Sequence, residues 1–168
     1  ANISGLRYDM ALSIPAELAS PLTGEETIRF DLKDPSGPLV IDFETSRDHV
    51  KSIEANGKPV PVTYMNGHLV LPAGSLTAGA NAVKIAFTAG NDSLNRSADF
   101  LYTLFVPARA RLALPVFDQP DLKGRWSVTL EHPSSWQSAA NGADIRFTSA
   151  NGALRLKHQR ERWDATNK

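Results

Sequence analysis

The sequence predicts an all-β fold, a β-sandwich of two sheets whose strands are mostly antiparallel. Three observations lead to this prediction: short runs of alternating apolar and polar residues recur along the chain, Asn-Gly dipeptides separate several of them, and no long segment has a convincing helical period. A chain of 168 residues is also long enough to bury a core of its own. We therefore expect residues 1–168 to form a single β-sandwich domain.

The first strands are indicated by alternation alone. Every even position from Leu6 to Ile14 is apolar, which is the period of a strand with one buried face. The same period returns in residues 27–33. After the breaks at Pro35 and Pro38, residues 39–41 form a short apolar run that is typical of a buried strand.

The next strands are marked by Asn-Gly dipeptides, which tolerate the positive φ angles of a two-residue hairpin turn. Asn56-Gly57 separates residues 50–55 from residues 60–64, and Asn66-Gly67 precedes a run at residues 68–71. Two further dipeptides of this kind are Asn141-Gly142 and Asn151-Gly152. The remaining strands are expected at residues 82–88, 100–105, 125–131, 145–148 and 153–158, with Trp126, Val128 and Leu130 facing inward.

Two segments do not fit a strand pattern. Residues 90–99 form a polar stretch that we expect to be a loop, and residues 107–123 are rich in proline and arginine with no clear period. Because binding residues are often carried by loops on a rigid scaffold, these segments are the first places to look for function.

Composition excludes several classes of function. Lys and Arg together balance Asp and Glu at 18 each, so the chain has no general attraction for nucleic acid or for anionic membrane surfaces. Cysteine is absent, which excludes disulfides and thiolate zinc sites. No apolar run approaches the roughly 20 residues of a membrane span. The compartment stays open, with a periplasmic or membrane-associated location slightly favoured over a cytoplasmic one.

The usual catalytic patterns are also missing. No histidine belongs to an H-E-x-x-H arrangement, which would place two imidazoles on one helical face to bind zinc. His158 and Glu161 resemble half of a ligand set, but they lie among basic residues and are typical of a solvated strand edge. Asp118 and Asp121 are interpreted as acceptors of backbone hydrogen bonds in a turn rather than as an acid and base pair. The sequence predicts no catalytic residue and no metal ligand in this chain.

One long block of the sequence matches a known family. Residues 101–111 (LYTLFVPARAR) and 114–123 (LPVFDQPDLK) resemble the signature of the N-terminal domain in the aminopeptidase N family, the alanyl aminopeptidases among the gluzincin zinc metallopeptidases. In that family a P-x-x-A-R element precedes F-D-Q-P-D-L-K at this spacing. Residues 24–33, 50–60, 76–87 and 136–142 match the family pattern in register, so the resemblance covers about four fifths of the chain.

The resemblance implies a role without catalysis for this domain. Members of the family have a saddle-like N-terminal domain that packs on a thermolysin-like catalytic domain, and the catalytic domain carries the zinc site. We therefore expect this chain to pack on its own catalytic domain and to help shape the cleft for a peptide substrate. We expect no cofactor here and zinc in the intact enzyme, and we expect the chain to end at a boundary inside that longer enzyme.

The sequence departs from the family at the positions nearest the expected cleft. Family members usually carry a Gln and a Glu, two residues apart, that help to bind the α-amino group of the substrate, and the matching positions here are Leu104 and Val106. Alternation places both side chains on one face of a strand. The resemblance thus implies an apolar wall where relatives have a polar anchor. Arg111, Asp118 and Pro120 belong to the matching block, and we expect Arg111 to pair with Asp118 and to order the irregular segment.

Two alternatives remain open from the sequence. The chain is also compatible with a free-standing β-sandwich module that binds carbohydrate or another protein, or with an inactive peptidase relative that serves as a scaffold. A carbohydrate module would be expected to expose aromatic residues on a sheet face or loop, whereas the pattern assigns Trp126 to the core, Trp136 to a loop and Trp163 to a terminal strand.

Overall fold

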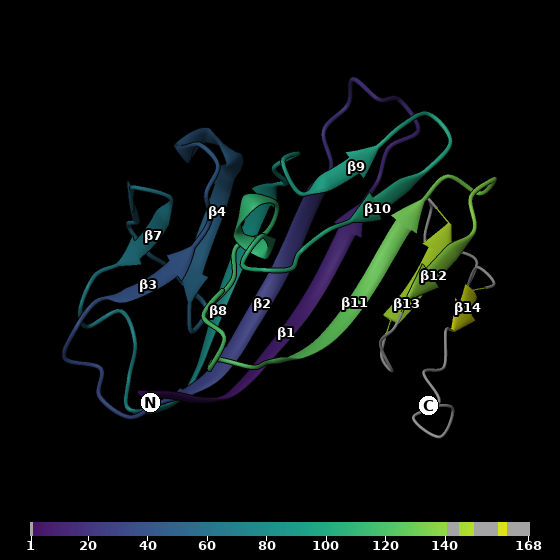
Figure 1. Cartoon of the computed structure of the whole chain (residues 1–168). Helices are drawn as coiled ribbons and strands as arrows, with labels where there is room; N and C mark the ends of the chain where they lie inside the picture. The colour runs from purple at the N-terminus through teal and green to yellow at the C-terminus, as the bar shows by residue number, and fades with distance from the viewer. Residues whose placement is uncertain (1, 141–144, 150–157, 161–168) are drawn as a thin grey trace.

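The computed structural model describes residues 2–140, 145–149 and 158–160, and these residues form strands and loops with two short 3-10 helices (Figure 1). The 3-10 helices are η1 (Arg47–His49) and η2 (Ala110–Leu112). In chain order the strands are β1 (Ile3–Ser13), β2 (Thr23–Leu32), β3 (Leu39–Asp42), β4 (Val50–Ala55), β5 (Lys58–Pro59), β6 (Thr63–Met65), β7 (His68–Leu71), β8 (Gly79–Thr88), β9 (Leu94–Arg96), β10 (Leu101–Thr103), β11 (Arg125–His132), β12 (Ser138–Ala140), β13 (Ile145–Ser149) and β14 (His158–Arg160).

The strands form two main sheets and two small ribbons. The large sheet has the order β13-β11-β1-β2-β8-β4-β5, and β3, β7 and β6 form a three-stranded antiparallel sheet. Pairing in the large sheet is antiparallel except where β11 pairs in parallel with β1 and β13. β9 pairs with β10, and β12 pairs with β14. The predicted all-β fold of two mainly antiparallel sheets is confirmed.

The large sheet turns one apolar face toward the core. Along β1, β2, β8 and β4, the residues Tyr8, Ile28, Val83 and Ala55 are cross-strand partners, and all are buried. Such rows arise because successive side chains of a strand point to opposite faces. The outer face of the sheet is polar and exposed, with pairs such as Lys84 and Glu25, whose charged atoms are 2.9 Å apart.

The small sheet closes the core from the other side. Leu39, Ile41, Leu69 and Leu71 are all buried and pair across β3 and β7. The ring of Phe43, just after β3, packs edge-on against Phe87 of the large sheet with centroids 5.8 Å apart. The core thus lies between the two sheets, as the alternating pattern predicted.

The Asn-Gly dipeptides that fall within the described residues form the expected turns. Asn56 and Gly57 have φ angles of 51° and 77°, and Asn66 and Gly67 have φ angles of 50° and 75°. Two successive positive φ angles define the type I′ turn, whose twist matches that of a hairpin. The dipeptides at 141–142 and 151–152 lie outside the described residues.

Several strand boundaries differ from the sequence prediction. The expected loop 90–99 contains β9, which pairs with β10; a strand of three residues is too short to show alternation. Of the expected strand 60–64, only Thr63 and Tyr64 lie in a strand, β6, and residues 60–62, which include Pro61, lie between β5 and β6. Trp126 lies on the core side of β11 and stacks on Tyr8 with centroids 4.0 Å apart, but the residue remains 37% exposed because β11 lies toward one side of the sheet. Of the expected strand 153–158, only His158 is described.

Candidate functional site

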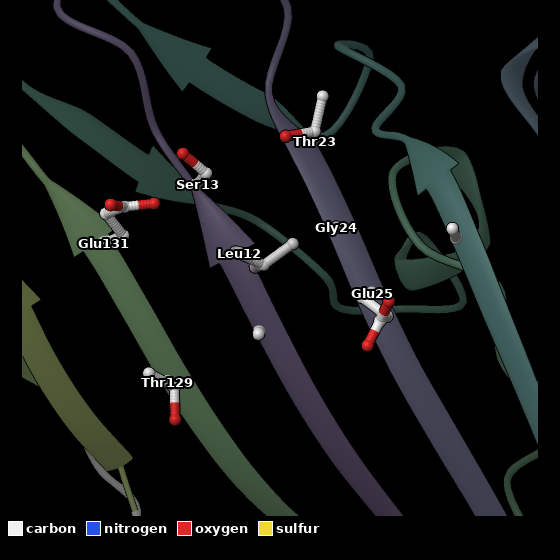
Figure 2. Close-up of a pocket in the computed structure, with 9 residues that line it drawn as sticks. Leu12, Ser13, Thr23, Gly24, Glu25, Thr129 and Glu131 are labelled. Carbon is white, nitrogen blue, oxygen red and sulfur yellow. The ribbon is translucent and has the colours of Figure 1, made fainter. Parts of the chain in front are cut away.

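The outer face of the large sheet carries an open hollow of about 440 Å³ (Figure 2). Figure 2 shows Glu131, Ser13 and Thr23 across adjacent strands at one end of the sheet, and these residues are cross-strand partners. Apart from Leu12, the remaining lining residues are small, polar or acidic. Glu25, the other carboxylate there, is paired with Lys84. Ser13 lies opposite Glu131, but no hydrogen bond joins a carboxylate of the hollow to one of its hydroxyl groups, so the hollow shows no activated nucleophile.

The opposite side of the sheet holds the residues that the sequence singled out. The chain leaves β10, forms η2 and then crosses the core face of the large sheet. Phe117 donates its N–H to the Tyr8 hydroxyl at 3.0 Å, and its ring packs edge-on against Phe30 at 5.9 Å. Burial raises the pKa of the Tyr8 phenol well above its ordinary value, so this group stays neutral. Leu114 and Val116 are buried beside it, which fixes the irregular segment to the core.

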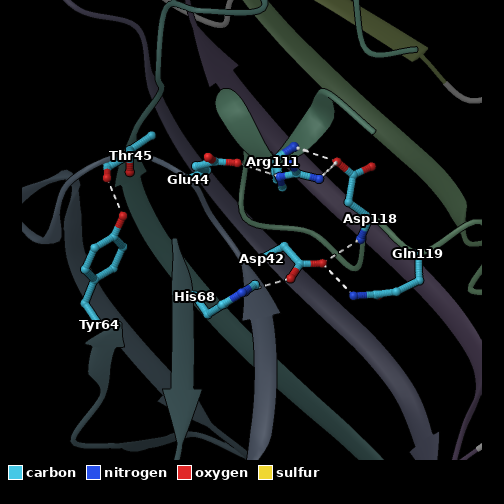
Figure 3. A network of polar contacts seen from close by, with 8 residues as sticks. All are labelled: Asp42, Glu44, Thr45, Tyr64, His68, Arg111, Asp118 and Gln119. Atoms are coloured by element: carbon cyan, nitrogen blue, oxygen red, sulfur yellow. Dashed lines mark hydrogen bonds and ion pairs between the residues drawn. The ribbon is translucent and has the colours of Figure 1, made fainter. Parts of the chain in front are cut away.

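A buried carboxylate holds the same segment from the side of the small sheet (Figure 3). Asp42 accepts hydrogen bonds from Gln119 Nε2 at 2.7 Å and from the Asp118 N–H at 3.0 Å, both to Oδ2. Its Oδ1 lies 2.9 Å from His68 Nδ1. The backbones of Asp42 and Val116 also exchange two hydrogen bonds, of 2.8 and 2.9 Å. We call Asp42, His68, Asp118 and Gln119 the Asp42 cluster.

Arg111 and Asp118 lie together, as expected, but they are joined mainly through the backbone of Arg111 and not by a hydrogen bond between the two side chains. The backbone N–H of Arg111 donates to Asp118 Oδ2 at 3.2 Å, whereas its guanidinium nitrogen lies 4.0 Å from the same oxygen. The short contact of the guanidinium is with Glu44, at 2.7 Å, and this hydrogen bond is the main cause that raises the pKa of Arg111. Pro120 is exposed and follows Gln119 in a turn closed by a 3.0 Å bond from the Leu122 N–H to the Gln119 carbonyl. Proline is favoured at the second position of such turns.

Leu104 and Val106 are 51% and 76% exposed, and they follow the end of β10 at Thr103 rather than lying in the expected strand. Phe105 between them packs against the core. Both residues therefore lie on the side of the chain that faces away from the core. Both residues precede Asp118 and Gln119 of the Asp42 cluster in the sequence, and neither side chain contacts a charged group among the described residues.

Sequence reasoning missed Asp42, Glu44 and His68. Asp42 ends a short apolar run, and its partners Asp118 and Gln119 are 76 and 77 residues away in the sequence. No local pattern carries information about such a contact. Asp118 was expected to accept backbone hydrogen bonds, and it accepts one from Arg111.

The described residues do not fit a bound zinc ion. Among them no group of three or more His, Cys, Asp and Glu side chains is placed to hold a metal. Asp42 and His68 are in contact, but protein donors already use both oxygens of Asp42. Glu161, of the His158 and Glu161 pair, lies outside the described residues. The described part of the chain also contains no helix long and apolar enough to cross a membrane.

Comparison with known proteins identifies the relatives of this fold. The profile of the peptidase M1 N-terminal domain matches residues 4–167. An aminopeptidase N of Streptomyces lividans is 27% identical over 125 residues, which are 68% of this chain and 14% of that protein. An M1 zinc metallopeptidase of Deinococcus radiodurans superposes with a TM-score of 0.66 at 20% identity, over 80% of this chain and 33% of the other. A leukotriene A4 hydrolase of Saccharomyces cerevisiae superposes with a TM-score of 0.62 at 17% identity, over 79% of this chain and 24% of the other. This chain therefore spans about a third or less of each relative.

Proposed function

This chain belongs to the peptidase M1 N-terminal domain family, and we propose that it is the non-catalytic N-terminal domain of a zinc-dependent aminopeptidase that removes N-terminal residues from peptides. The observation that carries the proposal is the family match over residues 4–167, supported by a fold shared with M1 zinc metallopeptidases, of which the match covers only 33%. The described residues offer no set of metal ligands. The zinc and the reacting groups would accordingly belong to a second domain.

The part of the domain that would shape the cleft is the chain around Leu104 and Val106. Both side chains are exposed, uncharged and held in place by the packing of Phe105 behind them. The segment that follows is fixed by the Asp42 cluster and by Phe117, which would hold this surface rigid against the second domain. A rigid apolar wall would leave the ammonium group of the substrate to the catalytic domain alone and would favour substrates with apolar N-terminal regions.

The aminopeptidase role can be tested on the longer protein of which this chain would be the first domain. We expect that protein to contain an H-E-x-x-H motif after residue 168, to retain zinc and to release N-terminal residues from peptides. If the protein carrying this chain lacks both the motif and the activity, the aminopeptidase role is wrong.

The cleft position can be tested separately by cysteine labelling. This chain has no cysteine, so Val106→Cys introduces one thiol into the domain. We expect a bound peptide analogue to block modification of this thiol in the longer enzyme. Val40→Cys is the matched control, because Val40 is also exposed but lies on β3 in the small sheet. Equal labelling of Val106→Cys with and without the analogue would remove Val106 from the cleft.

The alternative of a free-standing carbohydrate module has less support from the structure. Trp136 packs against the core and Trp126 stacks on Tyr8, so neither forms an open platform. The exposed aromatic residues Phe100 and Tyr102 stack on each other with centroids 6.1 Å apart. They continue the exposed surface of Leu104 and Val106 and are better explained together with it.

A further inference from the structure

Three arginines lie side by side on the outer face of the large sheet. Arg7 on β1 is the cross-strand partner of Arg125 on β11 and of Arg29 on β2, and these strands are adjacent in the sheet (Figure 1). All three residues are exposed. Alternation places them on the outer face, because neighbouring residues of the same strands point to the core. Those neighbours are Leu6, Tyr8, Ile28, Phe30 and Trp126. We call Arg7, Arg29 and Arg125 the arginine row.

The arginine row destabilises the sheet unless its charges are neutralised. Adjacent strands are about 4.8 Å apart, and like charges directly opposite each other on a sheet repel. Arg29 has a counter-ion, the carboxylate of Asp9, to which its Nη1 donates. Among the described residues, Arg7 and Arg125 form no ion pair and no side-chain hydrogen bond. Two neighbouring guanidinium groups therefore have all their donors free to bind an anion.

The backbone next to Arg7 is irregular. The ladder between β1 and β2 shifts its register between Ser4 and Arg7, and Gly5 has a φ of 64°. A bulge with glycine in the left-handed region changes the direction of nearby side chains, and bulges are common beside functional sites. A Cβ at position 5 would lie 2.9 Å from Asp31 Oδ2, so the carboxylate of Asp31 lies over Gly5. Asp31 and Asp9 therefore bound the arginine row on its two sides.

We propose that Arg7 and Arg125 bind a phosphate group of a small soluble compound, with Arg29 at the margin of the site. This site goes beyond the proposed function and does not depend on it. A guanidinium group presents a planar fork of N–H donors that matches the oxygens of a phosphate or a carboxylate. One fork occupies both oxygens of a carboxylate. Two adjacent forks need more acceptor oxygens, and a phosphate group supplies them.

The surroundings of the arginine row favour a compact anion over an extended one. Asp9 and Asp31 flank the row, and the same face of the sheet carries Glu25 and Glu131 in the hollow further along the strands. A nucleic acid or an anionic bilayer that covered this face would bring its negative charges against these four carboxylates. A phosphate group on a small molecule would contact the arginine row alone.

Thermal unfolding of this chain with inorganic pyrophosphate tests the proposal. A ligand that binds only the folded state raises the Tm, and we expect a rise of roughly 5 to 10 °C at about one hundred times the Kd. Citrate at the same ionic strength is the control, because it carries comparable negative charge on carboxylates and has similar general salt effects. Its effect should be less than half as large. Equal shifts with the two anions would overturn the assignment of a phosphate site.

Substitutions within the arginine row locate the site. Arg7→Gln and Arg125→Gln each remove one fork, and we expect each to weaken pyrophosphate binding at least about tenfold. Arg7→Lys keeps the charge without the fork and should retain only part of the affinity. Lys58→Gln is the matched control, because Lys58 is an exposed cation on β5 at one edge of the same sheet. If Arg7→Gln and Lys58→Gln bind pyrophosphate equally well, the arginine row is not the site.

The repulsion within the row can be measured without any ligand. Arg125→Gln should raise the urea midpoint at low salt, and the gain should shrink as added salt screens the charges. Arg125→Glu places a carboxylate beside Arg7, so it should raise the midpoint further and abolish pyrophosphate binding. Loss of binding in a more stable variant cannot result from misfolding. A lower urea midpoint for Arg125→Gln at low salt would show that the two guanidinium groups do not repel each other and would contradict the proposal.

A last measurement separates a soluble phosphate compound from a lipid headgroup. Vesicles of phosphatidylglycerol present phosphate groups on a flat surface, which would bring further negative charge against the carboxylates of the outer face. We therefore expect the chain to bind pyrophosphate and to remain in solution when the vesicles are sedimented at physiological salt. Sedimentation with the vesicles in the absence of pyrophosphate binding would show that the arginine row faces a bilayer and would overturn the proposal.

Discussion

Among the described residues, two carboxyl groups are buried, and their surroundings are opposite. Asp42, at the end of β3, is bonded to Gln119, the Asp118 amide and His68. Glu26, in the middle of β2, is 1% exposed, and neither of its oxygens has a hydrogen-bond partner among the described residues. The comparison teaches that burial alone does not define the role of a carboxyl group. Asp42 accepts hydrogen bonds from the irregular segment and holds it against the small sheet, whereas Glu26 makes no such contact.

The neighbours of Glu26 explain the difference. Its cross-strand partners are Met10 on β1 and Ile85 on β8, and Ile53 of β4 continues the same row. None of these side chains can donate a hydrogen bond. Burial is the cause that raises the pKa of Glu26 well above its ordinary value, so the neutral form is favoured in the folded state.

The largest expected effect follows from removal of the bonded carboxylate. Asp42→Ala leaves the Asp118 N–H, the Gln119 amide and His68 without their acceptor, and we expect it to lower the free energy of unfolding by about 3 to 5 kcal/mol. Urea denaturation measures this loss. Asp121→Ala is the matched control, because Asp121 is exposed in the same segment, and its effect should stay within about 0.5 kcal/mol. Equal effects of the two substitutions would show that the Asp42 cluster does not hold the segment.

The second effect has the opposite sign. Glu26→Leu replaces a buried polar group without partners by an apolar side chain of similar size, and we expect it to raise the free energy of unfolding at pH 7 by about 2 kcal/mol. The Asp42→Ala and Glu26→Leu variants should thus move the urea midpoint in opposite directions. Destabilisation by Glu26→Leu would mean that Glu26 has a partner in solution that the described residues do not contain.

The pH dependence of stability separates the two groups further. The folded-state pKa of Glu26 is raised, so the unfolded chain loses this proton first as the pH rises above its own value of about 4.3. The contribution of Glu26 to stability is therefore complete below that pH and declines as the pH approaches the folded-state pKa. We expect the stability of the parent protein to fall relative to Glu26→Gln across this window. A pH-independent difference between the two proteins would contradict a raised pKa.

The same two residues show what the sequence could predict and what it could not. Alternation is a local signal, so it predicted the longer strands and the core face, whereas the three-residue strands β9 and β12 were missed. The Asn-Gly dipeptides predicted the turns at residues 56–57 and 66–67. Glu26 occupies an even-numbered position like Ile28 and Phe30, but the predicted strand begins at residue 27, whereas β2 begins at Thr23. The charge of Glu26 favours an exposed position, whereas its even-numbered position in the alternating pattern favours the core. The packing of the sheet places it in the core.

The candidate site was only partly predictable for a related reason. The matching block identified Arg111 and Asp118, because both lie in one continuous segment. The principal partner of Arg111 is Glu44, which follows β3, and that of Asp118 is Asp42, the last residue of β3. Only the tertiary fold brings these two residues to the segment. The parallel pairing of β1 with β11 has no local signature either, although it brings Tyr8 beside Trp126.

A smaller effect is expected for an ion pair at the surface of the same segment. The side chains of Arg111 and Glu44 are 37% and 52% exposed, so water and salt screen their attraction. A double-mutant cycle of Arg111→Ala and Glu44→Ala should give a coupling energy below about 1 kcal/mol, and raising the salt concentration should reduce it. Arg111→Ala keeps the backbone N–H that Asp118 accepts, so the cycle isolates the side chains. Coupling as large as the Asp42→Ala effect would show that Arg111, rather than Asp42, anchors the segment.

The smallest effect on stability should come from a carboxylate placed where neither burial nor a partner constrains it. Val106 is 76% exposed, so Val106→Glu should change the free energy of unfolding by less than about 0.5 kcal/mol. In the longer enzyme its effect should be larger, because the proposed cleft would bring the new carboxylate near the ammonium group of the substrate. A charge-assisted hydrogen bond of about 1.5 kcal/mol or more corresponds to a KM for free-amine peptides at least tenfold lower. Val40→Glu on β3 is the control and should leave KM unchanged. If Val106→Glu also leaves KM and kcat/KM unchanged while the protein remains folded, Val106 lies outside the cleft, and a carboxylate there is only a solvated surface charge.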